Sequence, residues 1–443
     1  MNGDIPTTND SNTNTVPKND NFILDIIVSD PQRQRDESGS FVNYQVSTKS
    51  NIPSYHENYF DKTRFKNKQD FLNNILVVHR RYSDFLLLHT ILVNDYPSCI
   101  APPIPDKKVL QYISGDRFSP SFTEKRCHSL QNFLQKLALH PTYSRSKVLE
   151  TFLVSGSDWD IYRKSITVTN TGGVNVGITG NSGIKNEDVS DVLMNAFKHV
   201  RNQSEEFVEI KEKSEKLEYN IHKIDKVTHR VVKSQDSLTE DYNKLNLGLE
   251  NLKELISKEE HIENSRELLE KLKIFNNGIL KMTYSLRDLS KYYDYEYLVD
   301  LRDMEHYVDS LKQLLKLKDQ KQIDYEELND YLTKAINEKN NLISGYGGNF
   351  FTNKLEEIAG INQEASRREK IAKLETKINT LTSEVDDAKK IADNFEQEAL
   401  LEVGVFEQIK NETLKKSLGN LADNQIEYYE RLYQTWSEIE NKL

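Results

Sequence analysis

Proline is confined to the first third of the chain. All ten prolines lie at or before Pro141, and residues 142–443 contain none. A helix interior strongly excludes proline, because proline has no backbone N–H and its ring clashes with the preceding turn. We therefore expect the proline-free part to be helical almost throughout, and any sheet to lie before Pro141.

Apolar residues in the proline-free part recur at alternating steps of three and four. The runs extend over residues 217–256, 268–315 and 371–399, with breaks near 258–263 and at the glycines of 344–348. This spacing is typical of helices that pack along their length, so we expect three helices of roughly 70 to 90 residues. Tyr293, Tyr297 and Leu301 make two successive steps of four, which locally unwinds a heptad seam.

The proline-containing part has the pattern of a small α+β unit. Strands are expected at 22–28 and 41–48, separated by a polar turn at 31–40, with a third strand beginning at Ile75. Helices are expected at 83–94, 123–139 and 144–153. The predicted organisation is a disordered N-terminus at 1–20, an α+β domain at 21–155, a Gly/Thr-rich linker at 156–184 and helices at 185–443.

The segment Arg80–Phe85 is the strongest candidate for a binding site. It follows an apolar strand and opens an apolar helix, so its guanidinium groups lie at a helix N-terminus, where free N–H groups attract anions. An Arg-Arg pair alone is more often a solvated face or a salt-bridge donor. Because neighbouring strand residues face opposite sides, we expect Arg80 to anchor the fold and Arg81 to face the ligand.

Three motifs in one order carry a resemblance to a known family. Arg-Arg-Tyr-x-Asp-Phe at 80–85, Pro-Pro-x-Pro-x-Lys at 102–107 and Glu-Lys-Arg at 124–126 resemble the Phox-homology (PX) domain of the sorting nexins. The order and length of the helices that follow resemble the BAR domain of the sorting-nexin BAR class. The segment 311–325 resembles the yeast sorting nexin-4 group, also called autophagy-related protein 24.

The resemblance implies an α+β PX domain with a three-stranded antiparallel sheet, followed by an all-α, three-helix BAR-type antiparallel coiled coil. It implies binding to phosphatidylinositol 3-phosphate, with Arg81 on the 3-phosphate and Tyr82 beneath the inositol ring. Ser83 would cap the helix and donate to the same phosphate. Lys107 would contact the 1-phosphate, and Arg126 the inositol hydroxyls.

The same resemblance implies a peripheral membrane protein that is found in the cytosol and on the cytosolic face of endosomes. It implies that the protein retrieves cargo toward the Golgi and takes part in selective autophagy at the preautophagosomal structure. Its partners would be membranes that contain phosphatidylinositol 3-phosphate, a second copy or another sorting-nexin BAR protein, and autophagy machinery or cargo receptors. A lipid-binding adaptor or coiled-coil scaffold without curvature activity is the alternative.

Charge and motif content exclude other classes. Residues 1–184 carry 20 basic and 18 acidic side chains, and residues 185–443 carry 39 and 52. The acidic second half argues against nucleic acid, which needs a basic footprint, and predicts weak membrane attraction by the helices alone. We find no nucleophile, phosphate-loop or metal-ligand pattern, so no enzyme, cofactor or metal is expected. The two cysteines suggest a reducing compartment, and no apolar stretch is long enough to span a membrane.

Four features have two interpretations each. The tyrosines of 292–297 fit either a dimer interface or the core of one chain. Lys216, Lys223 and Arg230 form a stripe that is either solvated or membrane-facing. The proline loop with Ile100, Ile104 and Val109 either holds its shape or inserts beside the headgroup. The amphipathic pattern at 189–201 is either an interfacial wedge or the first turns of the long helix; its apolar members are Val189, Val192, Leu193, Ala196, Phe197 and Val200.

Overall fold

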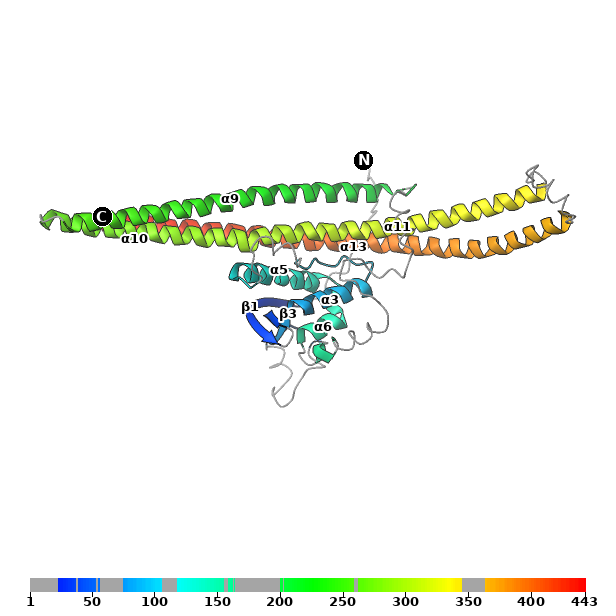
Figure 1. Ribbon diagram of the computed structural model, residues 1–443, viewed down its shortest axis with the longest axis horizontal. Coiled ribbons are helices and arrows are strands. Elements are labelled where there is room, and N and C mark those ends of the chain that lie inside the picture. The colour runs from blue at the N-terminus through cyan, green and yellow to red at the C-terminus, as the bar shows by residue number, and fades with distance from the viewer. Residues whose placement is uncertain are drawn as a thin grey trace, which may run out of the picture.

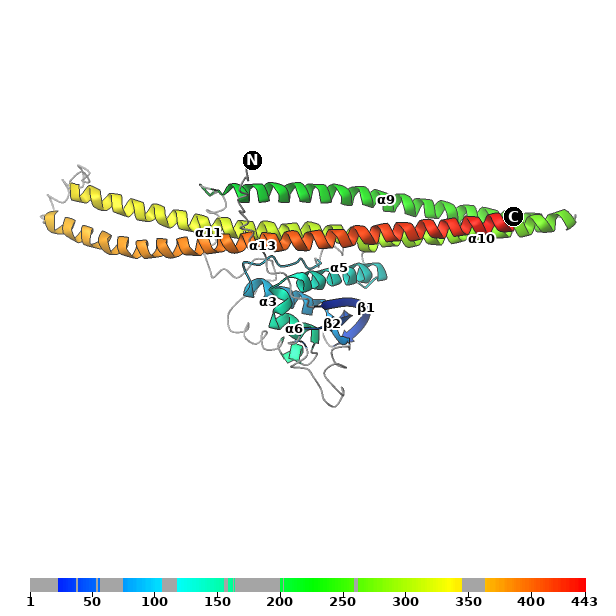
Figure 2. The same cartoon turned by 180° about the vertical axis from the view of Figure 1, so that it is seen from behind.

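The computed structural model consists of a small α+β unit beside a rod of long helices (Figure 1, Figure 2). It describes residues 23–36, 39–52, 55, 75–105, 118–154, 158–161, 163, 200–201, 203–258, 262–344 and 363–443. The predicted disordered terminus at 1–20 and most of the predicted linker at 156–184 lie outside the described residues.

The N-terminal unit is built on the predicted three-stranded antiparallel sheet, in the order β1-β2-β3. The strands are β1 (Leu24–Asp36), β2 (Gly39–Ser50) and β3 (Leu76–Arg81). Buried side chains alternate along β2, where Val42, Tyr44 and Val46 face the core. This alternation follows from the two-residue period of a strand and leaves the other face of β2 more exposed.

The predicted polar turn at 31–40 is wrong, because the two strands continue through it as a hairpin. They remain paired as far as Asp36 and Gly39. The register shifts between Ser29 and Gln32, and Asp30 there has a φ of +49°. This β-bulge accommodates Pro31, which has no N–H to donate to the ladder.

Three helices and a short 3-10 turn complete the core of this unit. The helices are α3 (Tyr82–Asp95), α5 (Pro120–Leu139) and α6 (Lys147–Val154), with η1 (Tyr143–Arg145) before α6. Phe85 of α3 packs edge-on against Phe152 of α6, and Phe152 packs against Trp159. Trp159 is 1% exposed, so the core of this unit includes a residue beyond the predicted boundary at 155.

The rod contains three helical passes, as predicted, with breaks where the sequence placed them. The helices are α9 (Glu205–Ser257), α10 (Ile262–Tyr292), the π-helix η2 (Tyr293–Tyr297), α11 (Leu298–Ser344) and α13 (Gln363–Lys442). α10, η2 and α11 run on as one helix. The first pass is shorter than predicted: α9 has 53 residues and begins after its N-cap, Ser204. Val200, Arg201 and Gln203 are not helical, so the described end of the amphipathic pattern is not part of α9.

The π-helix falls at the predicted double step of four. A single π-turn adds a residue to the helical repeat and thereby re-phases the apolar seam. Tyr292 and Tyr297 are each 7% exposed, and the hydroxyl of Tyr293 accepts a hydrogen bond from Gln425 of α13 at 2.7 Å. Of the two interpretations of the tyrosine run, these three side chains therefore fit packing within one chain.

The passes overlap unequally along the rod. α13 lies antiparallel to α11 and to the part of α10 that adjoins it, and it ends before the α9–α10 end of the rod, whereas α9 covers only α10 and the inner part of α11 (Figure 1). The outer part of α11 and the start of α13 form a two-helix arm. Tyr307 and Phe406 pack with ring centroids 4.7 Å apart in the middle of the rod, and both are 0% exposed. No helix among the described residues is long and apolar enough to cross a membrane.

Candidate functional site

Arg81 marks the transition from strand to helix in the candidate site. It is the last residue of β3 and the N-cap of α3, with the extended backbone that a cap requires (φ −90°, ψ 160°). Its backbone N–H donates to the Asp84 carboxylate at 3.0 Å, and its guanidinium Nε lies 4.0 Å from the other carboxylate oxygen. The Arg81 side chain is 32% exposed. Arg81 is therefore held by Asp84 while its guanidinium remains accessible.

The prediction that Ser83 caps this helix is wrong. The helix begins at Tyr82, so Ser83 is its second residue, and its side chain is exposed. The position still lies in the first turn, where backbone N–H groups have no intrahelical partner. Ser83 is thus placed to contact an anion, but not as a cap.

Tertiary packing brings Arg126 of α5 to Tyr82 of α3. The Arg126 guanidinium carbon lies 4.4 Å from the centre of the Tyr82 ring and 4.2 Å from that of Phe122. The Tyr82 hydroxyl donates to the backbone carbonyl of Pro105 at 2.7 Å. Arg81, Tyr82, Ser83 and Arg126 are therefore gathered at one end of α3, whereas Lys107 lies outside the described residues.

Arg80 faces the interior, as its strand position predicts. Its Nε donates to the carbonyl oxygen of Phe152 at 3.0 Å, and its guanidinium lies over the Phe152 and Trp159 rings at 5.1 and 5.6 Å. Burial lowers the pKa of Arg80 to about 10. It remains charged at neutral pH and ties β3 to α6.

Sequence reasoning missed Asp84 and Arg163 as supports of the site. Asp84 is 6% exposed and also accepts from Arg163 at 3.4 Å. The signal for Asp84 was present, because an acidic residue three positions after a helix cap commonly closes a capping box. Nothing in the sequence indicates Arg163, since its contact joins residues 79 positions apart.

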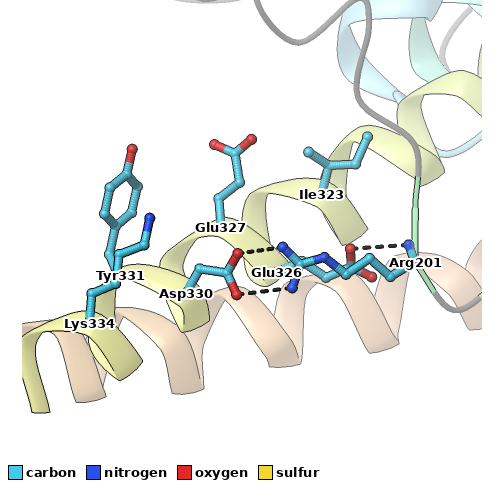
Figure 3. A pocket seen from close by; sticks show the side chains of 7 residues that line it. All are labelled: Arg201, Ile323, Glu326, Glu327, Asp330, Tyr331 and Lys334. Atoms are coloured by element: carbon cyan, nitrogen blue, oxygen red, sulfur yellow. Dashed lines mark hydrogen bonds and ion pairs between the residues drawn. The ribbon is translucent and has the colours of Figure 1, made fainter. Parts of the chain in front are cut away.

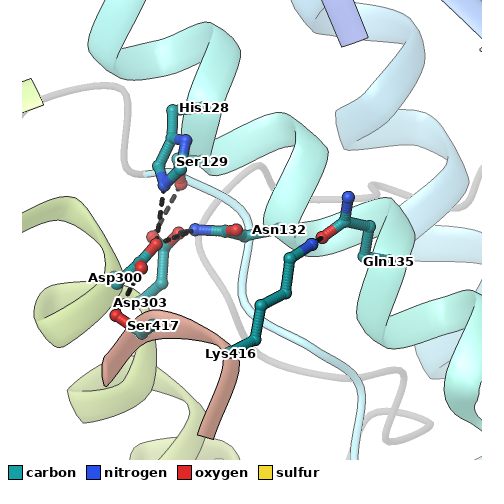
Figure 4. Close-up of polar contacts among 8 residues, drawn as sticks. All are labelled: His128, Ser129, Asn132, Gln135, Asp300, Asp303, Lys416 and Ser417. Atoms are coloured by element: carbon teal, nitrogen blue, oxygen red, sulfur yellow. Dashed lines mark hydrogen bonds and ion pairs between the residues drawn. The ribbon is translucent and has the colours of Figure 1, made fainter. Parts of the chain in front are cut away.

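A buried polar network joins the α+β unit to the rod (Figure 4). Asp300 of α11 accepts from His128 at 2.6 Å, from Asn132 at 2.9 Å and from Ser417 of α13 at 2.6 Å. One turn along α11, Asp303 accepts from Ser129 at 2.6 Å. α5 therefore contributes Arg126 to the candidate site, and its residues His128, Ser129 and Asn132 contact the rod. These contacts fix the site relative to the long helices.

The pKa values of two partners in this network shift in ways that favour the charged pair. Burial by itself would lower the pKa of His128, but the hydrogen bond and negative charge of Asp300 outweigh it, so the pKa is raised. Burial would raise the pKa of Asp300, but the hydrogen bonds from His128, Ser417 and Asn132 outweigh it, so the pKa is lowered. Nearby Lys136 is 2% exposed, and burial lowers its pKa.

Cys99, His140 and Glu402 place three potential metal ligands within 4.8 Å of one another. His140 Nδ1 accepts the backbone N–H groups of Thr142 and Tyr143 at 3.2 and 3.3 Å. An accepting ring nitrogen carries no proton, so the proton of the neutral imidazole is on Nε2, which donates to Glu402 at 2.9 Å. A metal would need the lone pair of that nitrogen. These residues form a second hydrogen-bonded link between unit and rod.

The proline loop does not present Ile100 to a membrane. Ile100 is 1% exposed and belongs to the apolar core of the rod. Its backbone N–H donates to Glu402 at 2.7 Å. Ile104 is half-buried against the core of the α+β unit, and Val109 lies outside the described residues. The insertion hypothesis is therefore wrong for Ile100, and Ile104 is only partly exposed.

Comparison with known proteins defines the class. The family model of the PX domain matches residues 55–155. A cryo-EM structure of the SNX-BAR Mvp1 tetramer superposes with a TM-score of 0.59 at 17% identity, over 94% of this chain and 99% of that one, which shows the fold. The chain is thus of the PX-BAR class: a PX domain precedes long helices that have the BAR-type fold.

Two relatives then identify the family. Sorting nexin-4 of Eremothecium gossypii is 58% identical over 424 residues, which cover 94% of this chain and 97% of the relative. Sorting nexin-4 of Saccharomyces cerevisiae is 56% identical over 432 residues, with 96% and 95% covered. The chain belongs to the sorting nexin-4 family.

Proposed function

We propose that the PX domain binds phosphatidylinositol 3-phosphate at the end of α3. Arg81 holds the 3-phosphate with its guanidinium fork, Ser83 donates to the same phosphate, and the inositol ring lies against Tyr82. Arg126 binds the inositol hydroxyls and Lys107 the 1-phosphate. The observation that supports this assignment is that two arginines lie beside Tyr82: Arg81, the N-cap of α3, and Arg126 of α5, whose guanidinium carbon is 4.4 Å from the centre of the Tyr82 ring.

Liposome flotation tests this assignment. Arg81→Ala removes a charge-assisted contact worth about 1.5–3 kcal/mol, so binding should fall at least about tenfold. Arg35→Ala removes an exposed arginine from β1 of the same domain and is the matched control. The pocket assignment is wrong if folded Arg81→Ala floats as well as the control with vesicles that contain phosphatidylinositol 3-phosphate.

We propose further that residues 185–443 form a BAR-type dimer, either with a second copy or with another sorting-nexin BAR protein. α9 exposes Leu238, Leu245 and Leu252 at seven-residue intervals, each more than 40% accessible. α13 exposes Tyr429 and Tyr433, and its C-terminal end lies at the same end of the rod as the C-terminal part of α9 (Figure 2). Exposed apolar side chains on two long helices favour coverage by a partner.

In this proposal the dimer senses or shapes curved endosomal membrane during retrieval of cargo from endosomes to the Golgi and during selective autophagy. The proposed parts are a disordered terminus at 1–20, the PX domain at 21–155, a linker at 156–184 and the BAR-type helices. The alternative is a lipid-binding adaptor without curvature activity. The excess of acidic side chains in residues 185–443, 52 against 39 basic ones, favours that alternative.

A further inference from the structure

Two consecutive cations of α5 serve different parts of the molecule. Arg126 belongs to the candidate site, with its guanidinium carbon 4.4 Å from the centre of the Tyr82 ring. Lys125 instead reaches the rod, where its Nζ lies 2.7 Å from a carboxylate oxygen of Asp294. Successive residues of an α-helix are about 100° apart around its axis, so neighbouring side chains contact different surroundings. The first turns of α5 are therefore shared between the candidate site and the long helices.

The spacing of residues along α5 separates these two faces. The face toward the rod carries Lys125, Ser129 and Asn132, at steps of four and three, and each of them contacts an acidic residue of the rod. The other face is buried and carries Phe122, Arg126, Leu130 and Phe133. Because both faces belong to one helix, a shift of α5 against the rod moves Arg126 relative to Tyr82.

Lys125 is buried, so its position depends on a counter-charge. Its side chain is 7% exposed, whereas that of Asp294 is 26% exposed. Its Nζ also lies 5.1 Å from the centre of the ring of Tyr295, the next residue of the rod. A buried ammonium group that loses its carboxylate partner is strongly destabilised. We expect it to move toward water and to displace Arg126 with it, because the two residues are consecutive.

Both rod partners of Lys125 lie in the π-helix η2. A π-turn holds one residue more than an α-turn, and such turns inside α-helices occur frequently at functional sites. Tyr293 and Tyr297 of η2 pack within the rod, whereas Asp294 and Tyr295 contact α5. The irregular turn of the rod therefore lies where the rod contacts the helix that carries Arg126.

We propose, on the basis of the headgroup site proposed above, that Asp294 positions Arg126 for lipid binding. Through Lys125 it holds the first turns of α5 so that the Arg126 guanidinium stays beside the Tyr82 ring. The π-helix of the rod is then part of the binding machinery of the PX domain.

The sign of the effect separates position from charge. Asp294 carries a negative charge close to a site for an anionic headgroup. By charge alone, its removal would strengthen binding, because the two negative charges repel each other. By position, its removal weakens binding, because Arg126 loses its place beside Tyr82. The two effects oppose each other, so weaker binding identifies the positioning role.

Calorimetric titration of the full chain with a soluble, short-chain phosphatidylinositol 3-phosphate measures this effect. Asp294→Asn should weaken binding about fivefold, the lower end of typical coupling between two sites. Asp294→Glu keeps the carboxylate and should bind more tightly than Asp294→Asn. The unreactive thiol of the buried Cys127 verifies that the PX domain of each variant is folded.

Two control variants remove a carboxylate from the rod elsewhere. Glu296→Gln is the matched control, because it removes the same charge from an exposed position in the same π-helix. Asp330→Asn breaks another ion pair of the rod, in which both carboxylate oxygens of Asp330 bind the guanidinium of Arg201 in the outer part of α11 (Figure 3). Neither variant should weaken binding.

A double-mutant cycle tests whether Asp294 acts through Arg126. In Arg126→Ala, the further change Asp294→Asn should have no effect, because no guanidinium is left to misplace. Equal weakening by Asp294→Asn with and without Arg126 would overturn the proposal and give Asp294 a general structural role. Binding by Asp294→Asn as tight as that of Glu296→Gln would also overturn it, and the headgroup site would stand if Arg81→Ala still loses binding. Normal binding by Arg81→Ala and Arg126→Ala would overturn the headgroup site and the positioning role together.

Discussion

Removing the Asp300 carboxylate should release the PX domain from the rod. In Asp300→Ala, His128 and Ser417 lose their acceptor, whereas Asn132 keeps Asp303 at 2.9 Å. Each buried donor left without a partner costs about 1–3 kcal/mol. The Asp300 side chain is 12% exposed, so some water reaches it, and we expect a total of about 3 kcal/mol. That loss raises the equilibrium constant for undocking about 100-fold.

The reactivity of Cys99 measures this undocking. Burial raises the pKa of the Cys99 thiol to about 12, with Glu402 of the rod adding to the shift. The docked thiol should therefore alkylate slowly, and undocking should restore its reactivity. Cys127, buried in the PX core, is an internal reference and should stay unreactive in a folded domain.

Glu124→Ala is the matched control for this prediction. It breaks the pair with Lys291, in which the side chains are 41% and 54% exposed, and such exposed pairs contribute about 0–1 kcal/mol. Alkylation of Cys99 should therefore change only a few-fold. If Asp300→Ala and Glu124→Ala alkylate Cys99 at the same rate, the network does not hold the domains together.

Three further predictions concern pH, dimerisation and the pocket rim. The raised pKa of His128 means that its charge stabilises docking below about pH 6.5 and that this contribution is lost as the pH rises through the raised value. The ratio of Cys99 alkylation in His128→Gln to that in the unmodified chain should therefore fall as the pH rises above about 6.5, and a constant ratio would contradict the charge assignment. Residues 185–443 should dimerise without lipid, and Tyr433→Asp should weaken this in light scattering; a monomer at micromolar concentration would count against a homodimer. Lys107→Ala should weaken binding in liposome flotation less than Arg81→Ala does, because a point charge at the rim of the pocket contributes less than a guanidinium fork. If Lys107→Ala loses more binding than Arg81→Ala, Lys107 and not Arg81 makes the main phosphate contact.

Features with a local signal were predictable from the sequence. The absence of proline after Pro141 and the heptad spacing predicted three helical passes, and the double step at Tyr293, Tyr297 and Leu301 coincides with the π-helix. Arg80 faces the interior and Arg81 stays accessible, as the alternation of side chains along a strand predicts. A polar turn was predicted at 31–40 because proline is typical of turns. In the structure a β-bulge accommodates Pro31, and the hairpin continues through this segment. Ser83 was misplaced as a cap because the acceptor that orders the helix start is Asp84.

Contacts between distant parts of the chain had no such signal. Asp300 and Asp303 lie on a helix with many acidic residues, and only their partners 168 to 174 positions away on α5 distinguish them. The proline loop with Ile100 allowed two interpretations, and nothing near it in the sequence indicates that Glu402 and the core of the rod cover Ile100. Hydrophobic period identifies which face of a helix is buried, but not which element covers it.

The central claim is that a PX pocket fixed to a BAR-type dimer reads membrane curvature. The most direct test compares the full-length chain with the PX fragment 21–163 on vesicles of several diameters and one composition that includes phosphatidylinositol 3-phosphate. Two pockets held on one rigid arc should bind better than a single pocket through effective concentration, and the advantage should be greatest on the smallest vesicles. Equal affinity of the two proteins at every diameter would contradict the account and leave a lipid-binding adaptor with a coiled coil.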